Sequence, residues 1–593
     1  MDSAATVTNE QSELVDLGDR SLRARIFFCK IPHLYEFLLT FAVFFGRFLY
    51  YGWTYFYQLD DYIQYHNYTE YFHLRVGGLW DYVADYLGLF TARPLAAFGD
   101  IYVISRFFSS LIVVVLFLSV MYAATAVILH RIFNKLFGTG YFFTVVFCLF
   151  PLAFEGLYWV SASSRIIPSL FFAALAARCM MSALECGRIR YVFLFAVTQI
   201  VSFGFYEQIT VLSIALAVMI TVIKRNKYWV TSLLIAANVL LYALYSQLSQ
   251  MLWEGGIYAS RSELALPFIT EDYFSTVFPS ATGQILQASG AFAPVANIRA
   301  LIRGFRLIIE DRAFVYLILL IGVTALCAFL LWKQGDAEKT EKKKVIGGVL
   351  WGIFLAVMPL APFYILKSSW IGVRALVPCL CGVALILDTL LRLITRSKRI
   401  VIVPVIALTI FVACIASVSE LHDYRAVTEF DRATAESVIE AVENHSDVDK
   451  MNEETRIAVI NVGATALSDQ NYRHHEHVAS ATGAGWSFTG LLRCLSGNGN
   501  FPDVTAMPVD ANGYFYYAAH GKSYRIENFD YVLVAIDGEI IEVTPAVGFT
   551  EDEFDGASSI RNYESYLLYS KDSERIARVV EYADHGTIEF TAN

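Results

Sequence analysis

Long apolar runs alternate with short polar connectors through residues 35–418 of the chain. A bilayer core about 30 Å thick requires roughly 20 apolar residues for a helix that crosses it. The pattern therefore predicts a polytopic α-helical membrane protein with about eleven transmembrane helices. We expect these helices near residues 35–55, 106–130, 138–154, 166–184, 190–205, 207–224, 228–249, 313–332, 345–365, 371–391 and 400–418.

Basic residues are concentrated in every second connector. The rich connectors lie within residues 20–30, 131–135, 188–190, 224–227, 333–344 and 392–399, whereas the alternate short connectors offer only Arg165, Lys367 and Arg374. Cytoplasmic loops carry the excess of Lys and Arg in membrane proteins. We therefore expect a cytoplasmic N-terminus, with two large outer loops at 56–105 and 250–312 and an extracytoplasmic C-terminal domain.

The composition separates the end of the chain from the rest. Over all 593 residues, 56% are apolar and 17% are charged, with a mean hydropathy of +0.50, but acidic residues crowd residues 419–593. There, Arg456–Val462 and Tyr531–Ile541 are strand candidates and residues 424–447 form a charged helical run. The sequence thus predicts a cytoplasmic segment (1–33), a transmembrane domain (34–420) and a small α/β domain (421–593).

The charge and the cysteines exclude several classes of function. The 55 acidic and 45 basic residues give a net charge of −10, which argues against nucleic acid as a partner. No pair of the nine cysteines has the spacing of a metal site. There is also no glycine-rich phosphate loop, so we expect chemistry on the outer face with a substrate already there.

The first outer loop opens with an acidic pair, Asp60-Asp61, directly after the first span. Carboxylates at a membrane edge stay hydrated or meet a partner, because their desolvation is costly. Either one could act as a general base on a hydroxyl, and either could also be a solvated helix end. Residues 68–90 then place apolar and aromatic side chains on one helical stripe, which predicts an amphipathic interfacial helix.

Further ionisable and aromatic residues recur at the same depth in the other outer connectors. Because ionisable residues at membrane depth tend to face a cavity and one another, they are candidate substrate-binding residues as well as candidate interface anchors. The set is Arg93, Glu155, Tyr158, Trp159, Arg165, Tyr206 and Glu207.

Arginines in the second outer loop, together with two cations before the tenth span, are candidate phosphate ligands. Arg299, Arg303 and Arg306 have the spacing of one helical face, and the guanidinium fork suits phosphate oxygens. Headgroup anchoring is the alternative for these three. Arg374 and Lys367 flank the outer turn before the tenth span.

The early acidic pair, the long first outer loop and the Arg93-Pro94 that precedes the second span together resemble the GT-C superfamily of membrane glycosyltransferases. The segments Leu59-Asp60-Asp61-Tyr62, Thr91-Ala92-Arg93-Pro94 and Glu155-Gly156-Leu157-Tyr158-Trp159 are similar to bacterial Gtr-type O-antigen glucosyltransferases. The resemblance covers roughly residues 35–420. It implies a bacterial inner-membrane enzyme of the cell envelope.

The resemblance also implies a reaction. A sugar would pass from a polyprenyl-phosphate donor to an extracytoplasmic glycan by inverting displacement, with Asp60 or Asp61 as the base. Arg374, Lys367 and the arginines at 299, 303 and 306 would stabilise the departing lipid phosphate. We expect no cofactor and do not favour a divalent metal, although the outer carboxylates could supply ligands. A polymerase or ligase of lipid-linked glycans and a non-enzymatic transporter are the alternatives.

Overall fold

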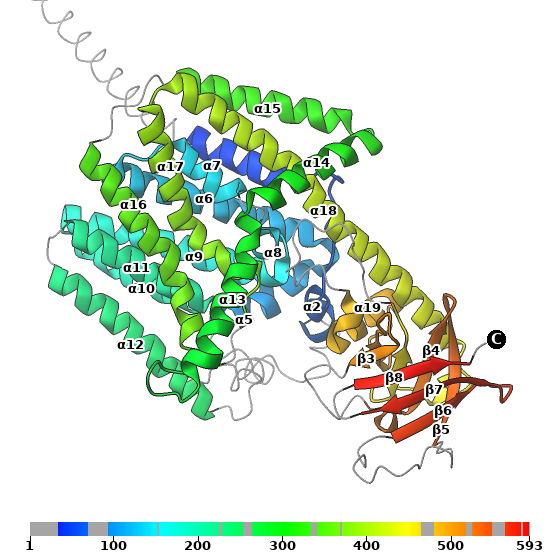
Figure 1. The fold of residues 1–593 in the computed structure, drawn as a ribbon. Helices are drawn as coiled ribbons and strands as arrows, with labels where there is room; N and C mark the ends of the chain where they lie inside the picture. Colours follow the sequence, from blue (N-terminus) through cyan, green and yellow to red (C-terminus); the bar gives the residue numbers. More distant parts are fainter. Residues whose placement is uncertain are drawn as a thin grey trace, which may run out of the picture.

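The computed structural model describes residues 34–68, 93–150, 153–224, 228–252, 264–333, 341–367, 370–463, 480–516, 525–547, 564–582 and 585–591. Helices make up most of the described residues as far as Glu443, and a strand-rich domain follows (Figure 1). The sequence-based expectation of a helical membrane domain with a separate α/β domain agrees with this architecture. The predicted amphipathic helix at 68–90 lies, except for residue 68, outside the described residues.

Eight helices among the described residues are long and apolar enough to cross a membrane, and a bent pair would make a ninth. The helical elements up to the bent pair are α2 (Asp61–Tyr68), α5 (Pro94–Gly99), η1 (Asp100–Ile104), η2 (Ser105–Ser110), α6 (Leu111–Phe137), α7 (Tyr141–Leu149), α8 (Phe154–Leu157), α9 (Val160–Cys186), α10 (Ile189–Phe203), α11 (Glu207–Lys224) and α12 (Tyr228–Leu252). The others are η4 (Tyr273–Val277), α13 (Phe278–Ala288), η5 (Ser289–Phe292), α14 (Pro294–Glu310), α15 (Phe314–Lys333), α16 (Lys342–Val357), η6 (Met358–Tyr364), η7 (Val373–Cys379), α17 (Leu380–Thr395) and α18 (Arg399–Glu443).

Three of the eleven expected spans are shorter in the structure than a bilayer requires. The helix Leu34–Gly46 replaces the first, α7 with 9 residues replaces the third, and α10 with 15 residues replaces the fifth. The expected spans included apolar residues of the flanking turns, where the backbone is no longer helical. Helix α7, for example, ends at Leu149 because Phe150 has extended backbone angles, whereas the expected span continued to residue 154.

The expected outer segment 250–312 contains the bent pair. One arm is Tyr273–Phe292 and the other is Pro294–Glu310, and the axes differ by 42°. The second arm, α14, packs tightly on α18, because a Cβ at Gly304 would lie only 2.1 Å from the carbonyl oxygen of Ile415. Two helix backbones can approach this closely only where a side chain is missing.

Helix α18 connects the two parts of the molecule. It runs without a break through the expected boundary at residues 420 and 421, and Figure 1 shows it leaving the bundle and ending against the sheet. Its last turns bury Ala435, Val438 and Val442 in the core of the C-terminal domain. The charged run predicted at 424–447 is therefore helical as far as Glu443, as an extension of the last span.

The C-terminal domain has one eight-stranded sheet of order β2-β1-β4-β5-β6-β7-β8-β3. Its first three neighbours, β2 (Asp503–Met507), β1 (Arg456–Ile460) and β4 (Tyr531–Ile536), are parallel, and β5 to β8 and β3 pair antiparallel. The remaining elements are β3 (Tyr514–Tyr516), β5 (Glu539–Val547), β6 (Glu564–Tyr569), β7 (Arg575–Glu581), β8 (His585–Phe590), α19 (Gly485–Ser496), η8 (Val448–Lys450), η9 (Ala481–Gly483) and η11 (Ile526–Asn528). The two predicted strands are confirmed as β1 and as β4 with the start of β5.

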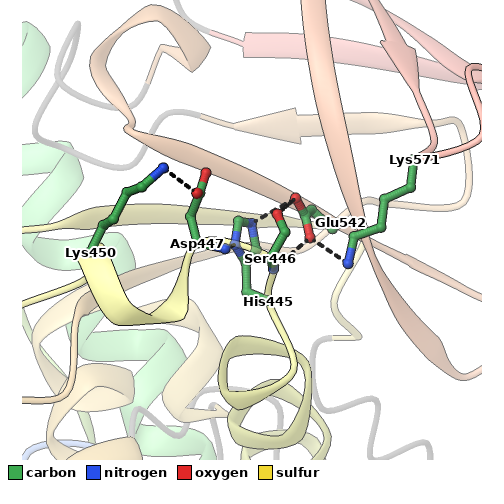
Figure 2. A network of polar contacts seen from close by, with 6 residues as sticks. All are labelled: His445, Ser446, Asp447, Lys450, Glu542 and Lys571. Carbon is green, nitrogen blue, oxygen red and sulfur yellow. Dashed lines mark hydrogen bonds and ion pairs between the residues drawn. The ribbon is translucent and has the colours of Figure 1, made fainter.

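A polar network fixes the end of α18 to the sheet (Figure 2). Glu542 on β5 accepts hydrogen bonds from the Ser446 hydroxyl at 2.6 Å and from Lys571 at 2.9 Å, and His445 lies 3.3 Å away. Although its partial burial opposes ionisation, the hydrogen bonds from Ser446 and Lys571 lower the pKa of Glu542. The network therefore favours the ionised carboxylate that holds helix and sheet together.

Candidate functional site

The two carboxylates of the acidic pair have opposite environments. Asp61 is fully buried and accepts four hydrogen bonds: from the Tyr55 hydroxyl at 2.6 Å, from the Gln58 amide at 3.0 Å, and from the Ser161 amide and hydroxyl at 3.0 and 2.9 Å. Burial raises its pKa to about 7, and these hydrogen bonds oppose the rise. Asp61 therefore ties the first loop to the start of α9.

Asp60 is partly exposed and faces the C-terminal domain. Among the described residues, only the indole N–H of Trp486 on α19 donates to its carboxylate, at 3.2 Å. The neighbouring Ser487 hydroxyl donates to the carbonyl of Leu59 at 2.6 Å. Trp486 was not a candidate residue, because nothing local in the sequence relates it to a carboxylate 426 residues away.

The backbone just before this pair is strained. Leu59 has a φ of 34°, in a region that residues other than glycine rarely adopt. The Trp159 indole donates to the Gln58 carbonyl at 3.2 Å, so side chains hold the carbonyls on both sides of the strained residue. Strain that the surroundings over-determine in this way is concentrated at functional sites.

A second group of polar residues, here called the Tyr206 cluster, consists of Arg93, Arg165, Tyr206, Glu207 and Arg374. The Arg93 Nε donates to both carboxylate oxygens of Glu207 at 2.8 Å, and its guanidinium lies 4.6 Å from the Tyr206 ring centre. The phenol is buried, and this burial raises its pKa, whereas the positive charges of Arg93 and Arg374 oppose the shift. Arg165 and Glu207 also act electrostatically on the same phenol, so the whole cluster converges on Tyr206.

Arg165 has a buried partner that sequence analysis missed. Its guanidinium bonds Asp100 Oδ2 at 3.1 and 3.3 Å, and the Ser164 hydroxyl donates to Oδ1 at 3.1 Å. Asp100 is only 1% exposed. The sequence signal that could have revealed this pair is Asp100 itself, a single carboxylate at the edge of an apolar run. Burying such a carboxylate is costly unless it is paired.

Arg374 joins the cluster through Glu155 and Trp159. Its guanidinium lies 3.9 Å from Glu155 Oε1 and 5.2 Å from the Trp159 ring centre, and Glu155 also accepts the Val373 amide at 3.1 Å. Gly156 allows this approach, because a Cβ there would lie 2.5 Å from the Val377 side chain. At 3.9 Å, the contact of Arg374 with Glu155 is longer than those of Arg93 with Glu207 and of Arg165 with Asp100.

Two predicted aromatic residues lie in the core instead of facing a substrate space. Tyr158 is fully buried, and its hydroxyl accepts the Phe56 amide at 3.0 Å. Trp159 is 1% exposed, and its indole holds the first loop through the hydrogen bond to the Gln58 carbonyl. Both side chains therefore position the first loop in this structure, and their role as substrate contacts stays a prediction.

The predicted phosphate ligands are not gathered in one place. Arg303 is buried and binds Asp423 and the Ser419 hydroxyl on α18, whereas Arg299 is exposed and Arg306 is exposed and lies 3.8 Å from Glu310. The three arginines lie on one helix as predicted, but Arg303 is engaged by α18, and the role of the three as phosphate ligands stays a prediction. Lys367 is exposed, next to the bridge between Leu264 and Leu366.

Within the part of the chain that the structure describes, no group of three His, Cys, Asp or Glu side chains could hold a metal ion. Comparison of the sequence with models of known protein families and with curated proteins gave no match. The candidate site is therefore defined by its geometry: a partly exposed carboxylate, Asp60, on a strained loop above the start of α9, and three arginines around Tyr206.

Proposed function

We propose that the protein is a membrane glycosyltransferase that transfers a sugar from a polyprenyl-phosphate donor to an extracytoplasmic glycan. The observation that supports this most is the contrast within the acidic pair: Asp61 is saturated with hydrogen bonds, and Asp60 remains accessible beside it. A general base must reach the hydroxyl whose proton it takes, so Asp60 is the base in this proposal.

The proposed reaction balances in atoms and charge, and it requires only a few groups of the protein. Asp60 takes the proton of the acceptor hydroxyl as its oxygen attacks the anomeric carbon from the side opposite the phosphate. The bond from that carbon to the phosphate oxygen breaks, and the lipid phosphate leaves as a stable anion. Preorganised cations near that oxygen stabilise the developing charge.

Arg374 is the cation that we assign to the leaving phosphate. Its planar fork can bind two phosphate oxygens, and its 3.9 Å contact with Glu155 is longer than the 2.8 Å and 3.1 Å contacts that hold Arg93 and Arg165. In this proposal Arg374 turns part of its fork from Glu155 to the phosphate, whereas Arg93 and Arg165 keep their carboxylates and shape the site.

The proposal requires the Asp60 side of the molecule to be extracytoplasmic. The distribution of Lys and Arg supports a cytoplasmic N-terminus and a C-terminal domain outside, and the resemblance to Gtr-type enzymes is the reason to propose a bacterial inner membrane. Reporter fusions after residue 420 should then read as extracytoplasmic, and reporters within 335–343 as cytoplasmic. The reverse result in either fusion contradicts this site.

The decisive experiment measures sugar transfer from a polyprenyl-phosphate donor in membranes that contain the protein. Asp60→Asn should lower the rate about a hundredfold or more, the usual cost of losing a general base. Asp272→Asn, which changes an exposed carboxylate of the second loop, is the matched control and should keep the rate. Arg374→Lys should weaken transfer, and Arg374→Ala should nearly abolish it.

The same assay separates the alternatives. A polymerase or ligase would use diphosphate-linked glycans and would not need Asp60, and a transporter would move its cargo in the Asp60→Asn variant as well. Near-normal transfer by Asp60→Asn contradicts the proposed base.

A further inference from the structure

A cavity of about 540 Å³ lies at the other end of the bundle, between the ends of α6, α9 and α17 and the starts of α7 and α18. We call it the His130 pocket. Its polar lining includes Glu36, His130, Arg131, Arg178, Asp388 and Arg392. Ser161, at the start of α9, binds Asp61, and Arg178 lies 17 residues further along the same helix, so the pocket is about 25 Å from the Asp60 site.

The two carboxylates of the pocket are already engaged by the protein. Asp388 accepts the amides of Gly140 and Phe143 at 2.9 and 3.2 Å, at the start of α7. Glu36 accepts from His130 Nδ1 at 2.5 Å. Neither carboxylate makes an ion pair with an arginine of the pocket among the described residues.

Donors are in excess on the same walls. Arg131 and Arg178 have no hydrogen-bond or ion-pair partner among the described residues, and the Arg131 Nε is buried. Nε2 of His130 is also buried and, within the same part of the chain, without a partner, but it is an acceptor in the neutral ring whose Nδ1 donates to Glu36, so the unsatisfied donor is the Arg131 Nε. A buried donor without an acceptor costs about 1–3 kcal/mol, so an acceptor is expected there.

The charges point to an anion. Arg178 acts unfavourably on the Arg131 guanidinium, as one positive charge near another must, and burial opposes its charge more strongly, whereas Glu36, which also binds His130, acts favourably on it. An anion between the two arginines would satisfy the donors and remove the repulsion. Two guanidinium forks suit the tetrahedral oxygens of a phosphate.

Part of the pocket lining is apolar and comes from α15 and from α18, which also contributes Arg399. Leu331, Ile402, Val403 and Ile406 form this apolar wall, close to the membrane-spanning part of both helices. A ligand that is anionic at one end and apolar at the other matches this division. Basic pockets between transmembrane helices on the cytoplasmic side bind anionic lipid headgroups in this way.

We propose that the His130 pocket binds a phosphate group through Arg131 and Arg178, and that the apolar wall selects a phosphate carried by a lipid. The site is separate from the Asp60 site, and the proposal is independent of the glycosyltransferase assignment.

The test uses the full-length protein, purified in a neutral detergent, and two probes: dioleoyl phosphatidic acid and inorganic phosphate. Lipid binding is counted by native mass spectrometry with phosphatidylcholine as the neutral comparison, and phosphate binding is measured by calorimetry. Arg131→Gln and Arg178→Gln should each weaken phosphatidic acid binding about tenfold, the equivalent of about 1.4 kcal/mol. Arg188→Gln changes an exposed arginine in the connector after α9, outside the pocket lining, and should leave binding unchanged.

Each outcome decides the question. A loss of phosphatidic acid binding in the two pocket variants alone supports the lipid site. Inorganic phosphate that binds with the same dependence, while phosphatidic acid does not, supports the phosphate site and overturns the role of the apolar wall. Equal binding of both probes by wild type, Arg131→Gln and Arg178→Gln overturns the proposal, and thermal unfolding of each variant shows that it is folded.

Discussion

The Asp60 side of the molecule and the His130 pocket use the same device in different electrostatic settings. At both, a buried carboxylate binds backbone amides near a helix start: Asp61 at α9 and Asp388 at α7. Around Tyr206, however, each arginine forms an ion pair with a carboxylate: Arg93, Arg165 and Arg374. In the pocket, neither Arg131 nor Arg178 forms an ion pair with a described residue. A site whose arginines are already paired with carboxylates can exchange one of these partners for a substrate during a reaction. A site with excess cations instead needs an anionic ligand that the protein does not supply.

The largest effect is expected where the ion pair between Arg165 of the Tyr206 cluster and its buried partner Asp100 is broken. Asp100→Asn leaves the charge of Arg165 without its buried partner, which should lower the free energy of unfolding by about 3 kcal/mol. Thermal unfolding of the purified protein measures this. The double variant Asp100→Asn/Arg165→Gln removes both charges and should regain most of the loss, and an additive result would contradict the coupling.

Asp61→Asn should cause the next largest loss of stability. The two carboxylate oxygens of Asp61 accept four hydrogen bonds, and the asparagine side chain would put an NH₂ donor in place of one of these oxygens. A loss of about 2 kcal/mol is expected, with Asp60→Asn as a nearly neutral control.

The pKa of Asp61 is raised to about 7 from 3.8, so the folded state holds a proton more tightly than the unfolded state between these pH values. Its contribution to stability therefore falls as pH rises from about 4 to 7 and is constant above. The difference in stability between wild type and Asp61→Asn should follow that slope, and a difference independent of pH would contradict it.

Glu207→Gln tests a more exposed pair. Arg93 and Glu207 are 20% and 37% exposed, so solvent screens their interaction, and the loss of stability should be below about 1 kcal/mol. A loss as large as that of Asp100→Asn would show that exposure does not rank these pairs. High salt should reduce the effect of Glu207→Gln more than that of Asp100→Asn.

The smallest effect is expected in the His130 pocket. Arg131→Gln removes a cation that repels Arg178 and has no partner among the described residues, so stability should change by no more than about 0.5 kcal/mol, with any change toward higher stability. A loss of several kcal/mol in the same unfolding assay, without added lipid, would show that Arg131 has a structural partner and would remove the contrast with the Tyr206 cluster.

Sequence reasoning identified much of the Tyr206 cluster, but it left the His130 pocket unrecognised. Arg93, Arg165, Tyr206, Glu207 and Arg374 were all candidates, because each interrupts an apolar run at the same depth. The basic residues of the pocket were used only as markers of orientation. The signal that could have revealed the pocket was Asp388 inside an apolar run, since a carboxylate there needs specific partners.

The sequence by itself determined the type and approximate position of most helices, the change to a strand-bearing domain and the asymmetry of basic residues, because these depend on local composition and periodicity. Only the tertiary structure decided which acid of the pair is accessible, since that depends on the strained turn at Leu59 and on Trp486, 426 residues from Asp60. It also decided that Arg303 binds α18 and that Arg131 and Arg178 line one cavity. Helix spacing places side chains along one element, but the partner of a charge is set by the packing of distant elements.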